Sequence, residues 1–498
     1  MSFIARVYAG LSWLRREVLS QFSGKVAIAL LVAIVAVSIY AAATMPSNYN
    51  VIWNYPLYWE ANPKNSPPEW STYFGTTCLT NQVYDLRTAT PRISVDEEGR
   101  VRLTYNMTYT LDVKSYPRAL ILIVDSMTIP ANVRNVRVLN TIVKPDGKQI
   151  QVFDDLVDFT KNVTAGSFKF TQTFRPELDK IYNSLLLNYI NYNIDPNDVG
   201  VNYLSYIFGE ITQPDPKSTA RTTYLTGRYV ISLTLDFRVE GVAQELLLRS
   251  IKNAARFEYV VVGTCYGLMG TDYQGRDLAM GLLYGFPIAL LIGLGTALMS
   301  TGLGLLAGMV SGYYGGFIDE FIQRFIDVLG SIPLLPILIL VAAAAQTAFG
   351  ADPNKPVLML LTILGVLVLF GWGGLAIVVR SMTLSIKSEL YVEAAKSIGA
   401  SNFRILIKHI LPQLVPYIAA SLVYSTPNAI LTEAGLSVLG IYHGLPTWGG
   451  ILAEARTQGR VEYWWWIFPP GLLIAITSLT FVLLGLALEK VVEPRLRR

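Results

Sequence analysis

The chain has few side chains of the kind that perform enzymatic chemistry. Of its 498 residues two are cysteine, Cys78 and Cys265, and two are histidine, His409 and His443. No Cys/His cluster has metal-ligand spacing, and no G-x-x-x-x-G-K-[ST] loop is present to hold ATP phosphates. No Ser/His/Asp grouping is evident either. We therefore expect no catalytic residue, no metal site and no bound cofactor.

One polar stretch stands out instead. EAAKSIGASNFRILIKHILP, residues 393–412, lies between two hydrophobic segments. Its apolar residues have helical spacing, Gly399 interrupts them, and Pro412 precedes the next apolar segment. The pattern predicts two short helices with a bend. Such a pair could lie flat on lipid headgroups, or protrude so that a partner protein grips it; the pattern alone leaves both open.

The composition is that of a membrane protein. Hydrophobic residues make up 52% of the chain and charged residues only 15%. The first apolar run, residues 26–45, has the length of about 20 residues that crosses a bilayer. The alternative is a signal peptide, but the run is long for one and lies far from the start. Five further runs lie after residue 278. We therefore expect six transmembrane helices.

The distribution of positive charge predicts the orientation. Basic residues flank the first span on its N-terminal side, which places that side in the cytoplasm. An even number of spans returns the C-terminus there, and the stretch at 393–412 is then cytoplasmic too. Residues 46–270 would lie outside. The basic residues at the two chain ends are Arg6, Arg15, Arg16 and Lys25, and Lys490, Arg495, Arg497 and Arg498.

The expected spans contain almost no ionisable residues near their middles. A charge at the bilayer centre costs about 2.5–3.5 kcal/mol on insertion scales, so transporters keep one only where it is used. Glu433 and Asp327 lie near span ends, where we expect solvated or capping carboxylates. A carrier driven by its own ion coupling is therefore disfavoured, and another subunit would supply the energy.

Glycine is frequent in the second and fourth expected spans. Small residues let helix backbones approach closely in lipid. The glycines could pack helices within this chain or form an interface with a second membrane subunit, and both interpretations stay open. They are Gly293, Gly295, Gly302, Gly304, Gly308, Gly365, Gly371, Gly373 and Gly374.

The stretch beginning at Glu393 resembles the EAA loop of ABC-importer permeases. Five further segments, in the same order along the chain, resemble the dipeptide/oligopeptide/nickel branch of that family. Importers of this branch use two permeases, and segments 270–285 and 492–497 resemble the second of them. The resemblance is strong over residues 270–498 and weak over 1–45. The segments are GTDYQGRDLAMGLLYG (270–285), GLLAGMVSGYYGGFIDEFIQRFIDVLGSIP (304–333), LTEAGLSVLG (431–440), PTWGGILAEAR (446–456) and VEPRLR (492–497).

The resemblance implies a permease subunit of an ATP-driven importer for peptides or oligosaccharides, with nickel also handled in this branch. Its implied partners are a similar second permease, two cytoplasmic ABC ATPases that bind ATP and Mg, an extracytoplasmic substrate-binding protein and membrane lipids, without nucleic acid. In the family the loop's short helix docks on the ATPase. By position, the coupling residues would be Glu393, Ala394, Ala395, Ser397, Gly399 and Ala400.

Residues 46–270 depart from the resemblance, because this segment is usually short in the branch. Two stretches alternate strictly between apolar and polar residues, 101–113 and 231–240, which predicts half-buried strands. VKPDGKQI (143–150) predicts a hairpin turn, and 176–192 and 242–253 predict helices. We expect a β-sandwich-like domain with helical insertions, which could receive the binding protein, form a chamber above the pathway or shield the complex.

Two cysteines and two glycosylation sequons mark this domain. Cys78 and Cys265 bracket it, and outside a membrane they could form a disulfide, the alternative being two separate buried thiols. Asn106 and Asn162 each begin an N-x-T sequon and are candidate glycosylation sites, although sequons also arise by chance.

The sequence thus predicts a mainly α-helical polytopic plasma-membrane protein with an extracellular β-rich (α+β) domain between transmembrane helices 1 and 2. The expected ranges are a cytoplasmic segment 1–25, a first span 26–45, the extracellular domain 46–270, a five-helix permease core 271–488 containing the coupling loop 381–412, and a cytoplasmic tail 489–498. The alternative is a membrane-anchored receptor, or a non-ABC channel or carrier, whose extracellular domain binds the ligand.

Overall fold

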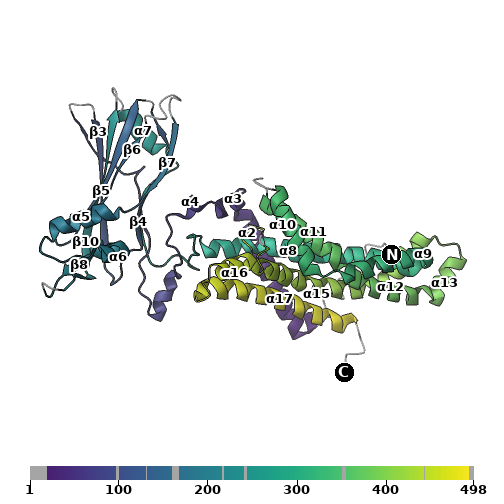
Figure 1. Ribbon diagram of the computed structural model, residues 1–498. Helices are drawn as coiled ribbons and strands as arrows, with labels where there is room; N and C mark the ends of the chain where they lie inside the picture. Colours follow the sequence, from purple (N-terminus) through teal and green to yellow (C-terminus); the bar gives the residue numbers. More distant parts are fainter. Residues whose placement is uncertain are drawn as a thin grey trace. The chain divides into compact units, whose positions relative to one another are not determined.

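A computed structural model describes residues 19–96, 100–130, 132–159, 168–215, 218–239, 244–349, 355–441 and 443–492. The chain forms two compact units (Figure 1). The helical unit comprises Met1–Tyr55 and Leu278–Arg498, and the β-rich unit comprises Pro56–Asp277. Outside the described residues lie Arg6, Arg15, Arg16, Asn162, Arg495, Arg497 and Arg498.

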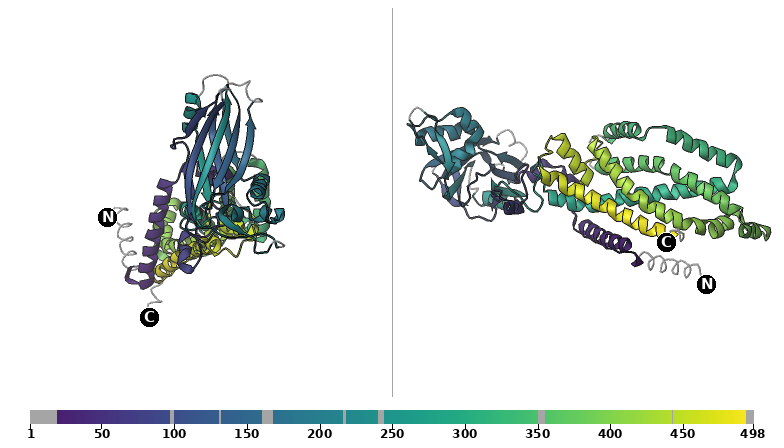
Figure 2. Two further views of the ribbon diagram at one scale, coloured as in Figure 1. Left: turned by 90° about the vertical axis from the view of Figure 1, so that its left-hand side faces the viewer. Right: turned by 90° about the horizontal axis from the view of Figure 1, so that it is seen from below.

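The helical unit contains long apolar helices joined by short ones. Figure 2 shows α2 beside α17, where the Gln21 side-chain amide donates to the carbonyl oxygen of Ala487 at 3.3 Å. The helices are α2 (Phe22–Thr44), α3 (Tyr49–Trp53), α8 (Leu278–Tyr314), α9 (Gly316–Ser331), α10 (Leu334–Phe349), α11 (Lys355–Gly371), α12 (Gly373–Lys387), α13 (Leu390–Ser397), α14 (Asn402–Ile405), η3 (Leu406–Ile410), α15 (Leu411–Val438), α16 (Trp448–Thr457) and α17 (Trp464–Val492).

Five helical stretches of the described chain are long and apolar enough to cross a membrane, and a sixth crosses only if the bent pair α9–α10 counts as one span. The two helices of that pair meet at 80°. The break follows from Pro333, because a proline disfavours helical geometry at the residue before it, and Ile332 is indeed extended. The third expected span is therefore a broken one.

The β-rich unit is built on two antiparallel sheets. A four-stranded sheet has the order β1-β11-β4-β7, a five-stranded sheet has the order β2-β3-β10-β5-β6, and β8 pairs with β9. The elements are α4 (Pro56–Trp59), η1 (Glu69–Phe74), β1 (Gln82–Asp85), β2 (Arg92–Val95), β3 (Arg100–Leu111), β4 (Ala119–Ile129), β5 (Val133–Val143), β6 (Gln149–Asp158), β7 (Phe168–Phe174), α5 (Leu178–Asn188), α6 (Pro196–Phe208), β8 (Gly209–Thr212), β9 (Arg221–Tyr224), β10 (Gly227–Val239), α7 (Gln244–Lys252) and β11 (Arg256–Val262).

The two larger sheets enclose one core. Tyr105 of β3 meets Phe257 of β11 edge to face, with ring centroids 6.0 Å apart. The hydroxyl of Tyr259 in β11 donates to Asn140 Oδ1 in β5 at 3.0 Å. The predicted strands β3 and β10 pair with each other and bury every second residue. The predicted sandwich-like β-rich region is therefore confirmed.

Candidate functional site: an exposed terminal helix and a polar groove

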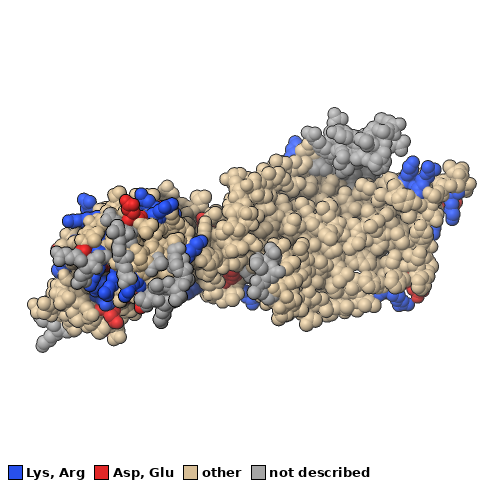
Figure 3. All heavy atoms as spheres, turned by 90° about the horizontal axis from the view of Figure 1, so that it is seen from above, with Lys and Arg blue, Asp and Glu red and all other residues tan. Residues whose placement is uncertain are grey.

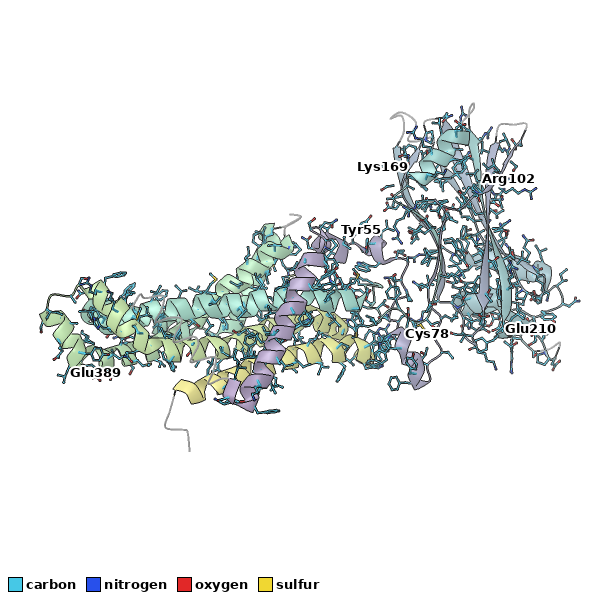
Figure 4. The ribbon with its side chains drawn as sticks, turned by 180° about the vertical axis from the view of Figure 1, so that it is seen from behind. Tyr55, Cys78, Arg102, Lys169, Glu210 and Glu389 are labelled. Atoms are coloured by element: carbon cyan, nitrogen blue, oxygen red, sulfur yellow. A yellow bond between two sulfur atoms is a disulfide. The ribbon has the colours of Figure 1, made fainter. Side chains whose placement is uncertain are left out.

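The predicted two-helix stretch lies at one end of the helical unit. Figure 4 shows Glu389, the residue just before α13, at the end opposite Tyr55. Gly399 separates α13 from α14 and has a φ of +86°, a conformation that glycine adopts without strain. The predicted bend is therefore present, and α14 continues through η3 into α15.

Core contacts hold this bend in place. Val392 of α13 and Ile405 of α14 belong to a buried cluster with Met309 and Tyr313 of α8. The Tyr313 hydroxyl donates to Asn402 Oδ1 at 2.9 Å, and the Lys387 ammonium donates to the Tyr313 carbonyl at 2.6 Å. A cation at that carbonyl also complements the negative end of the α8 dipole. The stretch is thus fixed to the helices behind it.

An ion pair ties three helices together beside it. Arg380 of α12 donates through Nε and Nη2 to the two carboxylate oxygens of Asp319 in the first turn of α9, both at 2.5 Å. The hydroxyl of Ser311 in α8 also donates to this carboxylate. A bidentate arginine pair fixes orientation as well as distance. The helices α8, α9 and α12 are therefore held together at the end of the unit that carries α13.

The outer surface of the bend is both apolar and basic. Leu390, Ile398 and Phe403 are 82%, 86% and 74% exposed. On the face that Figure 3 shows, the helical unit is almost free of charge along its length, and lysine and arginine gather at this end. The basic residues of the bend are Lys387, Lys396, Arg404 and Lys408.

Most of the predicted coupling residues lie on that surface. Glu393, Ala394, Ser397 and Gly399 are exposed, whereas Ala395 is buried. Their neighbour Ala400 is partly buried against the cluster that anchors the bend. The stretch therefore offers one exposed face and one anchored face.

A groove beside α15 was not predicted from the sequence. It has a volume of about 870 Å³ and is lined by polar and small residues of α15 and by Gly371, Gly374, Leu375 and Met382 of the α11–α12 segment. A smaller neighbouring cavity of about 210 Å³ shares Gly371, Ser425 and Asn428 with it. The α15 residues of the groove recur at helical spacing, which could have revealed this face: Tyr417, Ala420, Ser421, Tyr424, Ser425 and Asn428.

Several glycines of α8 pack helices within this chain, and an interface with a second membrane subunit stays a prediction. A side chain on Gly308 would come within 2.6 Å of the Ala376 carbonyl oxygen, so this glycine packs α8 against α12. Gly304 and Gly312, one turn away on either side, approach α12 just as closely. Gly302 faces open space. The glycines Gly371 and Gly374 belong to the groove instead.

Glu433 corrects one expectation. It is 5% exposed rather than solvated, and Oε1 accepts hydrogen bonds from Ser437 at 3.0 Å and from Thr447 at 2.9 Å. His443 Nδ1 accepts the Leu445 N–H, so its Nε2, 3.1 Å from the same oxygen, is the donor. Ser437 lies one turn further along α15, and the loop after α15 folds back and supplies His443 and Thr447, which the span pattern does not reveal. Asp327 is exposed, as expected.

In the β-rich unit, Cys78 and Cys265 are bonded, with Cα atoms 5.5 Å apart. The alternative of two separate thiols is therefore wrong. Asn106 lies on the exposed face of β3, and its Oδ1 accepts a hydrogen bond from Ser232 at 2.8 Å. Glycosylation at Asn106 stays a prediction, and Asn162 lies outside the described residues. The described part of the chain contains no group of His, Cys, Asp or Glu side chains suited to hold a metal ion.

Comparison with known proteins identifies the family. Residues 300–498 match the family described as "Binding-protein-dependent transport system inner membrane component". The dipeptide transport system permease DppC of Bacillus subtilis (strain 168) is 35% identical over 231 residues, which are 46% of this chain and 69% of the relative. The chain belongs to this family of ABC-transporter permeases. It is therefore a multi-pass membrane protein without a catalytic site of its own, and the alternatives of a receptor or a non-ABC carrier are wrong.

A second relative agrees with this assignment of the permease. The oligopeptide transport system permease OppC of Haemophilus influenzae (strain ATCC 51907 / DSM 11121 / KW20 / Rd) is 33% identical, with 46% of this chain and 71% of the relative covered. A chain of the MetNI methionine ABC transporter covers 43% of this permease and 98% of its own length, at 16% identity and a TM-score of 0.33. The family match begins at residue 300, so the β-rich unit falls outside it.

Proposed function

We propose that the permease is the second of two non-identical membrane subunits of an ABC importer for peptides. The names of the dipeptide and oligopeptide permeases that it resembles favour peptides over oligosaccharides or nickel. A binding protein delivers the peptide outside the cell, and two cytoplasmic ATPases supply the energy. The two permeases together enclose the pathway.

The exposed surface of α13 is the observation that carries this proposal. Leu390 and Ile398 present large apolar side chains at the end of the unit, next to basic residues. Large apolar side chains exposed on a helix that is anchored by a buried cluster are typical of a surface that contacts another protein. We assign this surface to the ATPase, with Glu393, Ala394, Ser397 and Gly399 at the contact.

Two observations support the proposed orientation. The basic residues around α13 favour the cytoplasmic side of the membrane. The bond between Cys78 and Cys265 suits an oxidising compartment, which the outer side of a membrane provides. The N- and C-termini are then cytoplasmic, and the β-rich unit is extracytoplasmic.

The groove beside α15 is the proposed half of the pathway. Polar side chains are costly where they face lipid, so a membrane helix normally turns them towards a water-filled space or a partner. Asn428 lies at the junction of the larger groove and the smaller cavity and is exposed. The matching face of the second permease would close the groove.

The coupling role is tested by Glu393→Arg, with Glu320→Arg as the control. Both carboxylates are exposed, and Glu320 of α9 lies outside the proposed docking surface. A reversed charge at a docking surface costs several kcal/mol when it meets like charge, so we expect Glu393→Arg to reduce co-purification of the ATPases at least tenfold while the control retains it. Normal association of the Glu393 variant in folded protein would contradict the coupling role.

The pathway and its substrate are tested together in proteoliposomes that contain the complete transporter. We expect ATP-dependent uptake of radiolabelled oligopeptides, and a reduction of about tenfold in Asn428→Leu, because leucine removes a polar group from the path. Thr362→Leu is the control, since Thr362 of α11 contributes to neither cavity. Uptake of oligosaccharides but not of peptides would contradict the proposed peptide substrate. Equal uptake by both variants would contradict the assignment of the groove to the pathway.

A further inference from the structure

The part of the β-rich unit next to the Cys78–Cys265 bond carries an exposed aromatic cluster. Tyr73 and Phe74 of η1 are 88% and 80% exposed, and Leu268 on the neighbouring segment is 70% exposed. Trp70 lies beside them, with its ring 6.1 Å from that of Phe74. We call these four residues the aromatic platform. Large apolar side chains that gather on a surface normally mark a site of contact.

The platform is rigid. Glu69 and Gly267 are joined twice, since the Glu69 N–H donates to the Gly267 carbonyl and the Gly267 N–H donates to Glu69 Oε1, both at 3.0 Å. The Trp70 indole N–H donates to the Leu268 carbonyl at 2.6 Å. The bond between Cys78 and Cys265 closes the same region. The aromatic rings are therefore presented by fixed backbone and not by a loose loop.

The platform also lacks charge. In residues 65–80 and 263–271 the one ionisable group with a formal charge at neutral pH is Glu69, and its carboxylate already accepts the Gly267 N–H. Protein surfaces that meet an acidic or basic partner carry complementary charge. Tryptophan and tyrosine without charged neighbours are instead typical of the membrane–water interface.

The chain keeps the platform near the membrane. Leu268 stands ten residues before Leu278, where α8 begins. Thr271 and Asp277 form an antiparallel bridge, which draws the intervening residues into a closed turn. The remaining backbone from Leu268 to Leu278 therefore spans at most about 20 Å. Because α8 has 37 residues and is therefore about 55 Å long, it exceeds the hydrocarbon core of about 30 Å, and its uncharged beginning lies no further than about 25 Å from that core.

We propose that the aromatic platform rests in the interfacial region of the leaflet at which α8 begins, with Tyr73, Phe74 and Leu268 in contact with lipid. The β-rich unit would then be attached to the membrane by a third point in addition to its two covalent connections. A lipid contact at its base would restrict the tilting of this unit relative to the bilayer.

Site-directed spin labelling of the full chain in lipid nanodiscs tests this contact. Both native cysteines are bonded to each other, so a single introduced cysteine is labelled selectively. We place labels at Tyr73→Cys and Phe74→Cys, and at Leu187→Cys as the control, since Leu187 of α5 is 76% exposed in the same unit. For each label we measure the ratio of its collision rate with oxygen to its collision rate with a water-soluble nickel chelate. We expect this oxygen-to-nickel ratio to be at least about threefold higher at the platform than at the control.

A second arm keeps the aromatic side chains in place. A label at exposed Thr72→Cys reports the same depth, and the additional changes Tyr73→Ser and Phe74→Ser should lower its oxygen-to-nickel ratio towards the control value. Equal ratios at platform and control would overturn the proposal. Protection from both reagents would also overturn it, because that result means that protein, either a second copy or a partner subunit, covers the platform instead of lipid.

Discussion

At the scale of single residues, Lys144 is a buried charge of the β-rich unit. It is 2% exposed in the turn between β5 and β6, and its ammonium group donates to the carbonyl oxygens of Tyr206 at 3.3 Å and of Gly209. Burial lowers the pKa of Lys144 from 10.5 to about 8, although the carboxylates of Asp146 and Glu210 oppose that shift. The lysine satisfies carbonyl groups at the end of α6 at the cost of desolvating a charge.

This pKa makes the stability of the β-rich unit depend on pH. Below pH 8, Lys144 is protonated in both states and its burial destabilises the fold in full. As pH rises from 8 towards 10.5 the folded state loses the proton first, so its stability increases. Between pH 8 and 10 we expect the free energy of unfolding to rise by about 2 kcal/mol more in the wild type than in Lys144→Met.

Urea unfolding of the full chain in nanodiscs, followed by proteolysis of the β-rich unit, measures this difference. Tyrosines that do not contact Lys144 ionise in the same way in both proteins, so their effect cancels in the comparison. Burial raises the pKa of Tyr189, whose hydroxyl does contact Lys144, above its usual value of 10, so this tyrosine stays protonated between pH 8 and 10. Parallel pH dependence in the two proteins would mean that Lys144 titrates normally.

Sequence patterns predicted some residues and not others. The pairing of Cys78 with Cys265 could be predicted because two cysteines bracketing an outer domain leave one possible intrachain bond. The burial of Glu433 could not, because His443 and Thr447 reach it only through the fold of the loop after α15. The coupling residues were located by resemblance, and the exposure of four of the six agrees with that assignment without testing it.

At the scale of elements, the contact between α8 and α12 rests on glycines spaced four residues apart. Gly304, Gly308 and Gly312 lie on one face, where a backbone carbonyl oxygen of the α12 segment lies within 3 Å of the position that a Cβ atom would occupy. In a bilayer, lipid tails are as apolar as helix side chains, so the hydrophobic effect does not drive two helices together. Close packing of their backbones stabilises the contact instead. Any carbon added on this face must push the helices apart.

We therefore expect Gly308→Ala to destabilise the helical unit by about 1–3 kcal/mol, because its methyl group would overlap the Ala376 carbonyl. Gly302→Ala on the same helix meets open space and should be neutral or stabilise by up to about 1 kcal/mol through helix propensity. Thermal unfolding of the two variants in the same detergent compares them. Equal midpoints would show that α8 and α12 do not pack as described.

Elements in which apolar and polar residues recur regularly were predictable from the sequence. Features that depend on tertiary contacts were not. The alternation in β3 and β10 gave their buried faces directly, and the Asp146-Gly147 turn between β5 and β6 is present. The 80° break between α9 and α10 was missed, since hydropathy alone averages over Pro333. The groove along α15 was missed although its residues recur at helical spacing, because the groove exists only where α15 lies beside the α11–α12 segment.

At the scale of the whole molecule, a large domain is inserted into a permease through a narrow base. The ends of the insertion are joined at Leu79 and Thr264, where the Thr264 N–H donates to the Leu79 carbonyl at 2.7 Å and the Leu79 N–H donates to Thr264 Oγ1 at 2.9 Å. The bond between Cys78 and Cys265 lies next to this junction. Each unit also has core clusters of its own. The insertion is therefore built so that the permease need not rely on it for folding.

Deletion of residues 80–263, with a short Gly-Ser turn joining Leu79 to Thr264, tests that independence. The two joined residues are already hydrogen-bonded neighbours, so the turn requires no rearrangement of the base. We expect the shortened permease to fold, to keep the Cys78–Cys265 bond and to co-purify with the ATPases as the full chain does, because α13 and its anchoring cluster belong to the helical unit. Loss of ATPase association would contradict this independence.

Peptide uptake by the same assembled variant then decides what the insertion contributes. If uptake and binding-protein docking persist, the β-rich unit has no direct part in delivery. If assembly persists while docking fails, the unit receives the binding protein.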